Sequence, residues 1–81
     1  MTINVLCFAS CSDIIGSRKL EIEAEEPHSV KDLLDNLIAQ HPKLSHMERS
    51  LMISVNQSYV ERSQLLKDGD EVALIPPVSG G

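Results

Sequence analysis

The sequence has few aromatic residues and no long apolar run. Phe8 and Tyr59 are its only aromatic side chains, so a core must be built from Leu, Ile and Val. No apolar stretch approaches the roughly 18 residues of a membrane-spanning helix, and no signal peptide or lipid-anchor motif is visible. These absences predict an intracellular protein of the cytoplasm with no membrane partner.

Basic residues are also scarce. Seven Lys and Arg against twelve Asp and Glu give a formal net charge of −5. Such a surface repels phosphate backbones, so nucleic acid is not expected as a partner. The acidity favours protein partners with basic patches, because complementary charge raises association rates.

Residues that usually build metal and catalytic sites are few and unsuitably spaced. Cys7 and Cys11 are separated by three residues, unlike the C-x-x-C redox motif, and two thiols cannot complete a zinc site. Cys7 falls in an apolar run and is expected to be buried, whereas the exposure of Cys11 is left open. His28, His41 and His46 match no metal-binding spacing. Because the glycines form no phosphate-binding loop and no Ser/His/Asp arrangement can be defended, we expect no metal site and no bound cofactor.

The first part of the chain predicts two strands paired as a hairpin. Residues 3–10 are apolar on both faces, as is typical of a central strand. Residues 12–16 predict a single helical turn that Ser12 caps and Gly16 ends. Residues 19–25 alternate between apolar and charged side chains, which indicates a half-buried strand. The expected faces of the first strand are Ile3, Val5, Cys7 and Ala9 on one side and Leu6 and Phe8 on the other.

The middle of the chain predicts one main helix. Ser29 is a candidate N-cap, and Asp32 three residues later resembles a capping box. His41-Pro42 ends the helix, since the residue before proline is pushed out of the helical region. A short second helix is expected over residues 44–49. The apolar stripe of the main helix has helical spacing and consists of Val30, Leu33, Leu34, Leu37 and Ile38.

The last part predicts strands at residues 51–55, 59–60 and 71–75, with a glycine turn at Gly69. The element order favours an α+β roll, in which one main helix packs across a mixed sheet. In such a roll the first and last strands are parallel neighbours. Phe8 and Ile75 would then lie close together on the face away from the helix, with Tyr59 joining them. This apolar patch is a candidate partner interface.

The chain ends in a short arm with unusual chemistry. We expect residues 1–75 to form the domain and residues 76–81 to form a flexible, reactive C-terminal tail. The two prolines stiffen its exit, and the two glycines remove side-chain bulk beside the terminal carboxylate. The tail can reach about 20 Å, far enough to enter a partner's active site. It consists of Pro76, Pro77, Val78, Ser79, Gly80 and Gly81.

Five segments in order along the whole chain resemble the MoaD family, the small sulfur-carrier subunit of molybdopterin synthase. The Asp-Gly-Asp-Glu-Val turn at residues 68–72 and the Gly-Gly end are shared with other ubiquitin-like sulfur carriers. The combination of Val-Asn-Gln with Pro-Pro-Val-Ser-Gly-Gly is more specific. Cys7 departs from the family, which usually has a bulky residue there. The segments are residues 4–9 (Asn-Val-Leu-Cys-Phe-Ala), 13–16 (Asp-Ile-Ile-Gly), 55–57 (Val-Asn-Gln), 68–73 (Asp-Gly-Asp-Glu-Val-Ala) and 76–81.

The resemblance implies a ubiquitin-like β-grasp fold and a function. Gly81 would be adenylated by a MoeB-like enzyme that uses ATP, and would then carry a thiocarboxylate. The tail would thread through Gly80 into a MoaE-type large subunit, within a heterotetramer. There the sulfur would pass to cyclic pyranopterin monophosphate in molybdenum cofactor biosynthesis. The chain would be non-catalytic alone and would be the sulfur-donating subunit of the complex.

Three alternatives stay open at the level of sequence. Gly81 could join a lysine of a target, as in a ubiquitin-like protein modifier. The same fold could carry sulfur for thiamine synthesis or tRNA thiolation. The chain could also be a binding module whose tail is passive. The stiff Pro76-Pro77 base and the apolar sheet face favour a dedicated heteromeric subunit.

Overall fold

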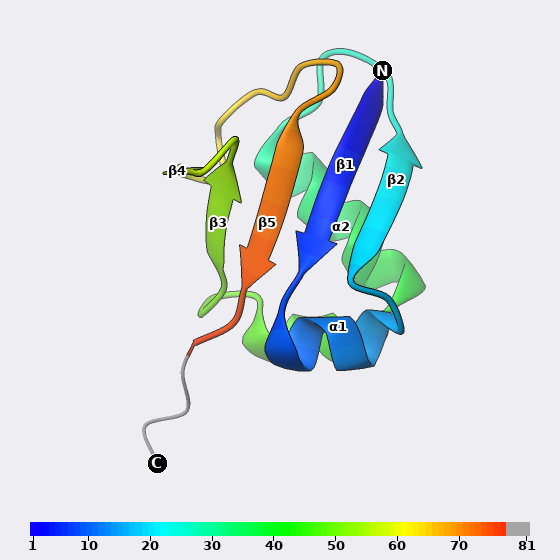
Figure 1. Ribbon diagram of the computed structural model, residues 1–81, viewed down its shortest axis with the longest axis vertical. Coiled ribbons are helices and arrows are strands. Elements are labelled where there is room, and N and C mark those ends of the chain that lie inside the picture. The colour runs from blue at the N-terminus through cyan, green and yellow to red at the C-terminus, as the bar shows by residue number, and fades with distance from the viewer. Residues whose placement is uncertain (78–81) are drawn as a thin grey trace.

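Five strands form one mixed sheet in the order β2-β1-β5-β3-β4 (Figure 1). The computed structural model describes residues 1–77. The central β5 runs parallel to β1, as predicted, and antiparallel to β3. β2 and β4 are the edges, each in an antiparallel pair with its neighbour. The strands are β1 (Thr2–Cys7), β2 (Lys19–Glu23), β3 (Met52–Val55), β4 (Ser58–Tyr59) and β5 (Glu71–Ile75).

Helix α2 (Val30–Gln40) covers one face of this sheet (Figure 1). The predicted capping box is present: Asp32 N–H donates to Ser29 Oγ at 3.1 Å, and Ser29 N–H donates to Asp32 Oδ2 at 3.0 Å. His41 follows the last helical residue as the C-cap. Four residues of the predicted stripe are buried, and Ile38 is partly buried against them. The sheet side of this core is formed by alternate strand residues, namely Ile3, Val5, Cys7, Ile53, Val55, Val72 and Leu74.

The end of β1 differs from the prediction. A strand over residues 3–10 is wrong, because the chain leaves the sheet after Cys7 and forms helix α1 (Ala9–Ile15). Ala9 has φ 47°, which turns the backbone, and Cys11 is fully buried in the core. The burial of Cys11 explains why the chain forms a helix after Cys7 instead of continuing as a strand. In the helix, the Cys11 side chain closes the end of the core beneath the sheet. Gly16 ends α1 in the left-handed conformation, as predicted.

A short 3-10 helix of six residues, η1 (Pro42–Met47), replaces the predicted helix over residues 44–49 and buries Leu44. The connection from η1 to β3 is held by Arg62. Its Nη2 donates to the carbonyl oxygens of Glu48 and Leu51 at 2.7 and 2.8 Å. The sequence did not predict these long-range hydrogen bonds, which we call the Arg62 clamp.

The loop before β5 supports the start of that strand. Leu66 is buried and Leu65 is exposed, so one of the two leucines enters the core, as expected. Gly69 has φ 83°, which explains the need for glycine in the turn. Asp70 Oδ1 accepts from Asn56 Nδ2 at 2.9 Å, and the Asn56 carbonyl oxygen Oδ1 accepts from Glu71 N–H at 3.0 Å. The architecture is the ubiquitin-like β-grasp fold, with a mixed sheet and one main helix packed across it.

Candidate functional site: the open sheet face and the root of the tail

The tail leaves the most constrained strand of the sheet. β5 has a hydrogen-bonded neighbour on each side, β1 and β3. It ends at Ile75, Pro76 is buried and Pro77 is exposed. The position and direction of the chain at Ile75 are therefore fixed by the core. The predicted threading residues Val78, Ser79 and Gly80 and the predicted reactive residue Gly81 lie outside the described residues, so their roles stay predictions.

One row of side chains runs across the face of the sheet opposite α2. Leu6 is in register with Ala73, Ala73 with Ser54, and Ser54 with Tyr59. Residues directly opposite in neighbouring strands project from the same face. Tyr59 lies at the edge of this row and is 67% exposed.

A second row lies closer to the tail. Met52 is in register with Ile75, and Phe8 N–H donates to the carbonyl oxygen of Leu74 at 3.4 Å. This places Phe8 beside the end of β5. Phe8 and Met52 are 47% and 48% exposed, and Ile75 is partly exposed. We call the six residues of both rows that carry apolar or aromatic side chains the apolar sheet face: Leu6, Phe8, Met52, Tyr59, Ala73 and Ile75.

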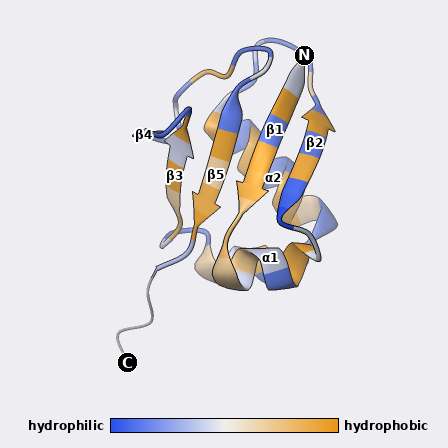
Figure 2. Cartoon of the chain, viewed as in Figure 1, coloured by the Kyte–Doolittle hydropathy of each residue, from blue (hydrophilic) through white to orange (hydrophobic). Residues whose placement is uncertain are grey.

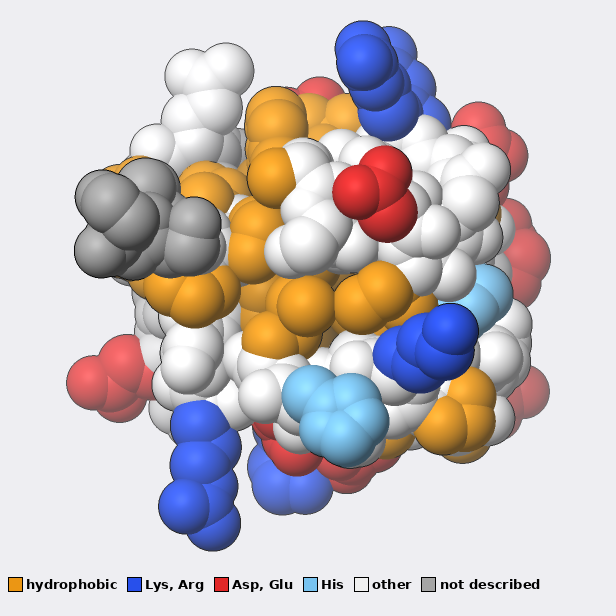
Figure 3. Space-filling view, turned by 90° about the horizontal axis from the view of Figure 1, so that it is seen from below, with side chains coloured by type: hydrophobic (Ala, Val, Ile, Leu, Met, Phe, Trp, Pro, Cys, Tyr) orange, Lys and Arg blue, Asp and Glu red, His pale blue; other side chains and the backbone are white. Residues whose placement is uncertain are grey.

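The same side of the sheet is acidic at its other end. Asn4 is in register with Glu21 and with Glu71, and Thr2 is in register with Glu23. Figure 2 shows the change along β5, which is hydrophilic at its start and hydrophobic toward the tail. The apolar part of the face is thus the part next to the tail. Seen from below, apolar side chains gather around the point where the chain leaves the fold (Figure 3).

The three predicted interface residues are exposed or partly exposed, and the structure adds Leu6, Met52 and Ala73 to their face. Phe8 is not a strand residue as predicted but the residue immediately before α1. Met52 went unnoticed in the sequence, although its alternation with the buried Leu51 and Ile53 signals an outward position. Leu6 was expected on this face without a role, and it lies next to Ala73.

Titratable groups near the site do not supply a nucleophile. Burial raises the pKa of the Cys7 thiol to about 11, with a smaller contribution from nearby Cys11. Burial also raises the pKa of the Cys11 thiol. Both thiols are free, and Cys11 Sγ lies 3.5 Å from Met47 Sδ. The thiols therefore behave as small core side chains.

Residues 1–77 lack two further features. Within that range, no three His, Cys, Asp or Glu side chains are grouped so that they could hold a metal ion. Within it, too, no helix has the length and apolar character to cross a membrane.

A β-grasp sheet with an apolar face beside the root of a Gly-Gly arm defines a ubiquitin-like carrier or modifier. The family model described as the ThiS family matches residues 5–81. The chain belongs to this family, and it is similar to proteins named molybdopterin synthase sulfur carrier subunit. One of them, from Chlamydomonas reinhardtii, is 41% identical over 83 residues, which cover 100% of both chains.

Solved structures agree with this assignment. A putative molybdopterin converting factor subunit 1 from Pyrococcus furiosus is 31% identical, with a TM-score of 0.87 over 96% of this chain and 99% of that chain. The protein SAMP1 from Haloferax volcanii is 28% identical, with a TM-score of 0.85 over 100% of both chains. The chain is also similar to a protein in a complex of subunits 1 and 2 of molybdopterin-converting factor from Helicobacter pylori, at 27% identity and a TM-score of 0.69 over 100% of both chains.

Proposed function

We propose that this chain is the sulfur carrier subunit of a molybdopterin synthase, and that Gly81 carries the sulfur. The observation that carries the proposal is that the Pro-Pro-Val-Ser-Gly-Gly segment follows directly on the central strand, whose end lies on the apolar sheet face. The domain can dock through that face while the arm enters a partner's active site. The relatives named as sulfur carrier subunits support the same function.

The chemistry begins with activation of Gly81. A carboxylate is a poor electrophile near neutral pH, so a MoeB-like enzyme would transfer AMP from ATP to the terminal carboxylate and release pyrophosphate. Hydrosulfide from a sulfur donor would then attack the Gly81 carbonyl carbon and displace AMP, which leaves a thiocarboxylate. Because Gly80 and Gly81 have no side chains, the carbonyl stays sterically open. ATP is used by the activating enzyme, and the chain itself binds no cofactor.

The second partner would be a MoaE-type large subunit, in a heterotetramer with two small subunits at the ends of a large-subunit dimer. The complex from Helicobacter pylori supports a partnership of this kind. There the thiocarboxylate would give its sulfur to cyclic pyranopterin monophosphate in molybdenum cofactor biosynthesis. The apolar sheet face would bind the large subunit, and the steps would take place in the cytoplasm.

A ubiquitin-like protein modifier remains the second candidate. The similarity to SAMP1 favours it, since two further matched structures are named small archaeal modifier protein 1, and one of them gives SAMP1 as its abbreviation. In that function the activated Gly81 would form an amide with a lysine of a target protein. Sulfur transfer for thiamine or tRNA would use the same thiocarboxylate but a different acceptor.

The intact mass of the protein tests the proposal, after expression with the activating enzyme and a sulfur source. We expect the mass gain of one oxygen exchanged for one sulfur, mapped to Gly81. A matched control that lacks Gly81 should show no gain. An unmodified mass, with Gly81 found instead in amide linkage to other proteins, would establish the modifier and overturn the carrier. Addition of the large subunit and cyclic pyranopterin monophosphate should then remove the sulfur, and its retention would contradict the molybdopterin pathway.

A further inference from the structure

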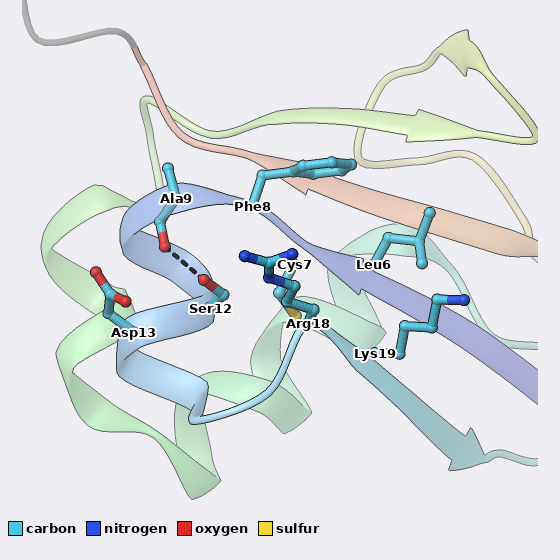
Figure 4. A pocket seen from close by; sticks show the side chains of 8 residues that line it. All are labelled: Leu6, Cys7, Phe8, Ala9, Ser12, Asp13, Arg18 and Lys19. Atoms are coloured by element: carbon cyan, nitrogen blue, oxygen red, sulfur yellow. Dashed lines mark hydrogen bonds between the residues drawn. The ribbon is translucent and has the colours of Figure 1, made fainter.

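A pocket of about 570 Å³ opens between the end of β1, helix α1 and the start of β2 (Figure 4). We call it the α1 pocket. Its apolar wall consists of Leu6, Phe8 and Ala9. Leu6 and Phe8 also belong to the apolar sheet face, so the pocket is continuous with the surface proposed to bind the large subunit. A partner that covers that face would also cover the mouth of the pocket.

The rim of the α1 pocket at the start of β2 is basic. Arg18 and Lys19 both line it and both are exposed. The backbone here is fixed, because the Arg18 carbonyl oxygen accepts from Cys7 N–H at 2.8 Å and Lys19 is in register with Leu6. Within residues 1–77 the one ion pair joins Lys31 to Asp35, so no carboxylate there forms an ion pair with either cation of the rim.

The other polar groups of the pocket do not cancel this charge. Ser12 Oγ donates to the carbonyl oxygen of Ala9 at 2.7 Å. Asp13 is exposed and belongs to the lining, but its carboxylate points away from the other labelled side chains (Figure 4). The pocket therefore presents the cations of Arg18 and Lys19, while the one carboxylate of its lining, that of Asp13, points away from them. The protein as a whole has a net charge of −5.

We infer that the α1 pocket receives a carboxylate side chain of the large subunit, together with an apolar neighbour of that side chain. The inference rests on the function proposed above. The apolar neighbour would pack on Leu6 and Phe8, and the carboxylate would bind Arg18 and Lys19. A guanidinium is suited to this task because its planar N–H groups match both oxygens of a carboxylate.

The charges elsewhere on the sheet give this contact a specific role. Glu21, Glu23 and Glu71 project from the acidic end of the same side. A carboxylate of the partner would be repelled there and attracted at the α1 pocket, so the pocket sets the register of docking. Complementary charges of this kind fix orientation and raise the association rate.

The test compares two charge-reversed variants of equal net charge. Arg18→Glu/Lys19→Glu removes the basic rim, and Lys43→Glu/Lys67→Glu reverses two exposed cations that do not line the pocket. Binding of the purified large subunit from the same organism is measured by calorimetry at several NaCl concentrations. Thermal unfolding of each variant confirms that it is folded.

We expect the rim variant to bind about 30-fold more weakly or worse, and the control variant to stay within about 3-fold of the wild type. Added NaCl should weaken the wild type more than the rim variant, whereas Arg18→Lys/Lys19→Arg should retain most of the affinity. Equal affinities of the rim and control variants would overturn the inference and leave the proposed function intact. Tighter binding by the rim variant would show a basic occupant and also overturn it. No binding by the wild type would overturn the proposed partnership and the inference together.

Discussion

Phe8 donates its backbone N–H to the carbonyl oxygen of Leu74 at 3.4 Å. The bond joins the residue that leaves β1 to the penultimate residue of β5, so the exposed aromatic ring lies beside the root of the tail. The ring is 47% exposed although the backbone that carries it is fixed. An exposed aromatic side chain on a rigid backbone is a typical anchor of a protein interface, because little conformational entropy is lost on binding.

Substitution Phe8→Asp should therefore weaken binding of the large subunit far more than it weakens the fold. We expect a loss of at least about 2 kcal/mol of binding free energy, which is roughly 30-fold in Kd. The free energy of unfolding should change by less than about 1 kcal/mol, because the ring is half exposed. Calorimetric titration and urea unfolding measure the two quantities.

Leu65→Asp is the matched control for Phe8→Asp. Leu65 is 58% exposed but lies in the loop that contacts Ser29, outside the apolar sheet face. The same change there should leave binding within about 3-fold of the wild type. If Phe8→Asp lowered stability and binding by equal amounts, Phe8 would be a core residue and the docking surface would lie elsewhere.

Leu34→Ala should destabilise the domain strongly. Leu34 lies on the buried stripe of α2 and is 1% exposed. Removing a buried leucine side chain costs about 2–5 kcal/mol, through lost transfer energy and the cavity left behind. A domain of this size has roughly 5 kcal/mol to lose, so part of the population would be unfolded at room temperature. Urea unfolding measures the loss, with Ala39→Gly on the exposed side of α2 as a propensity control of about 1 kcal/mol.

Helix α2 shows what the sequence could predict. The spacing of its leucines, the Ser29 cap and the proline after His41 are local signals, each contained within a few residues. The pairing of β1 with β5 was also predicted, because the element order favours an α+β roll, in which the first and last strands are parallel neighbours. The predicted interface followed from this pairing, because parallel pairing of the two strands places Phe8 and Ile75 on the side of the sheet away from α2.

The end of β1 shows where sequence reasoning failed. Residues 8–10 are as compatible with a strand as with a helix, and the choice depends on whether Cys11 can close the end of the core. That contact exists only after α2 and η1 are in place. The Arg62 clamp is likewise formed across 11 and 14 residues of sequence, with backbone carbonyls that carry no residue-specific signal.

Cys7 and Cys11 should be unreactive in the folded protein. Burial raises both pKa values, that of Cys7 to about 11, so about one Cys7 thiol in a thousand is ionised at pH 8. We expect iodoacetamide to modify neither thiol in buffer and both in urea, as read by intact mass. Fast modification of native protein near neutral pH would show that the core opens readily at the α1 end.

The capping box of α2 should make the free energy of unfolding depend on pH in the acidic range. The Ser29 backbone N–H, and then the Ser29 hydroxyl, hold the pKa of the Asp32 carboxyl below its ordinary value of 3.8. A lowered pKa in the folded state stabilises the fold above the unfolded pKa, and this stabilisation is lost as the pH falls through the folded pKa. Asp32→Asn should therefore lose less stability than the wild type between about pH 7 and about pH 3 in urea unfolding. Ser29→Ala should cost about 1 kcal/mol near neutral pH through the lost cap. Equal acid sensitivity of Asp32→Asn and wild type would contradict the assigned cause.

Extension of the chain beyond Gly81 should abolish sulfur transfer without unfolding the domain. One added residue removes the free Gly81 carboxylate, and with it the group that AMP would activate. Within residues 1–77 the hydrophobic core cluster ends at Leu74 and the last buried residue is Pro76, several residues before the change, so the melting temperature should stay the same. Binding of the large subunit should persist through the apolar sheet face, which separates docking from chemistry. Conversion of cyclic pyranopterin monophosphate by the reconstituted complex is the readout, with mass spectrometry to confirm that the extension has not been trimmed. Activity of an untrimmed extended chain would show that Gly81 is not the carrier residue, whatever the apolar sheet face binds.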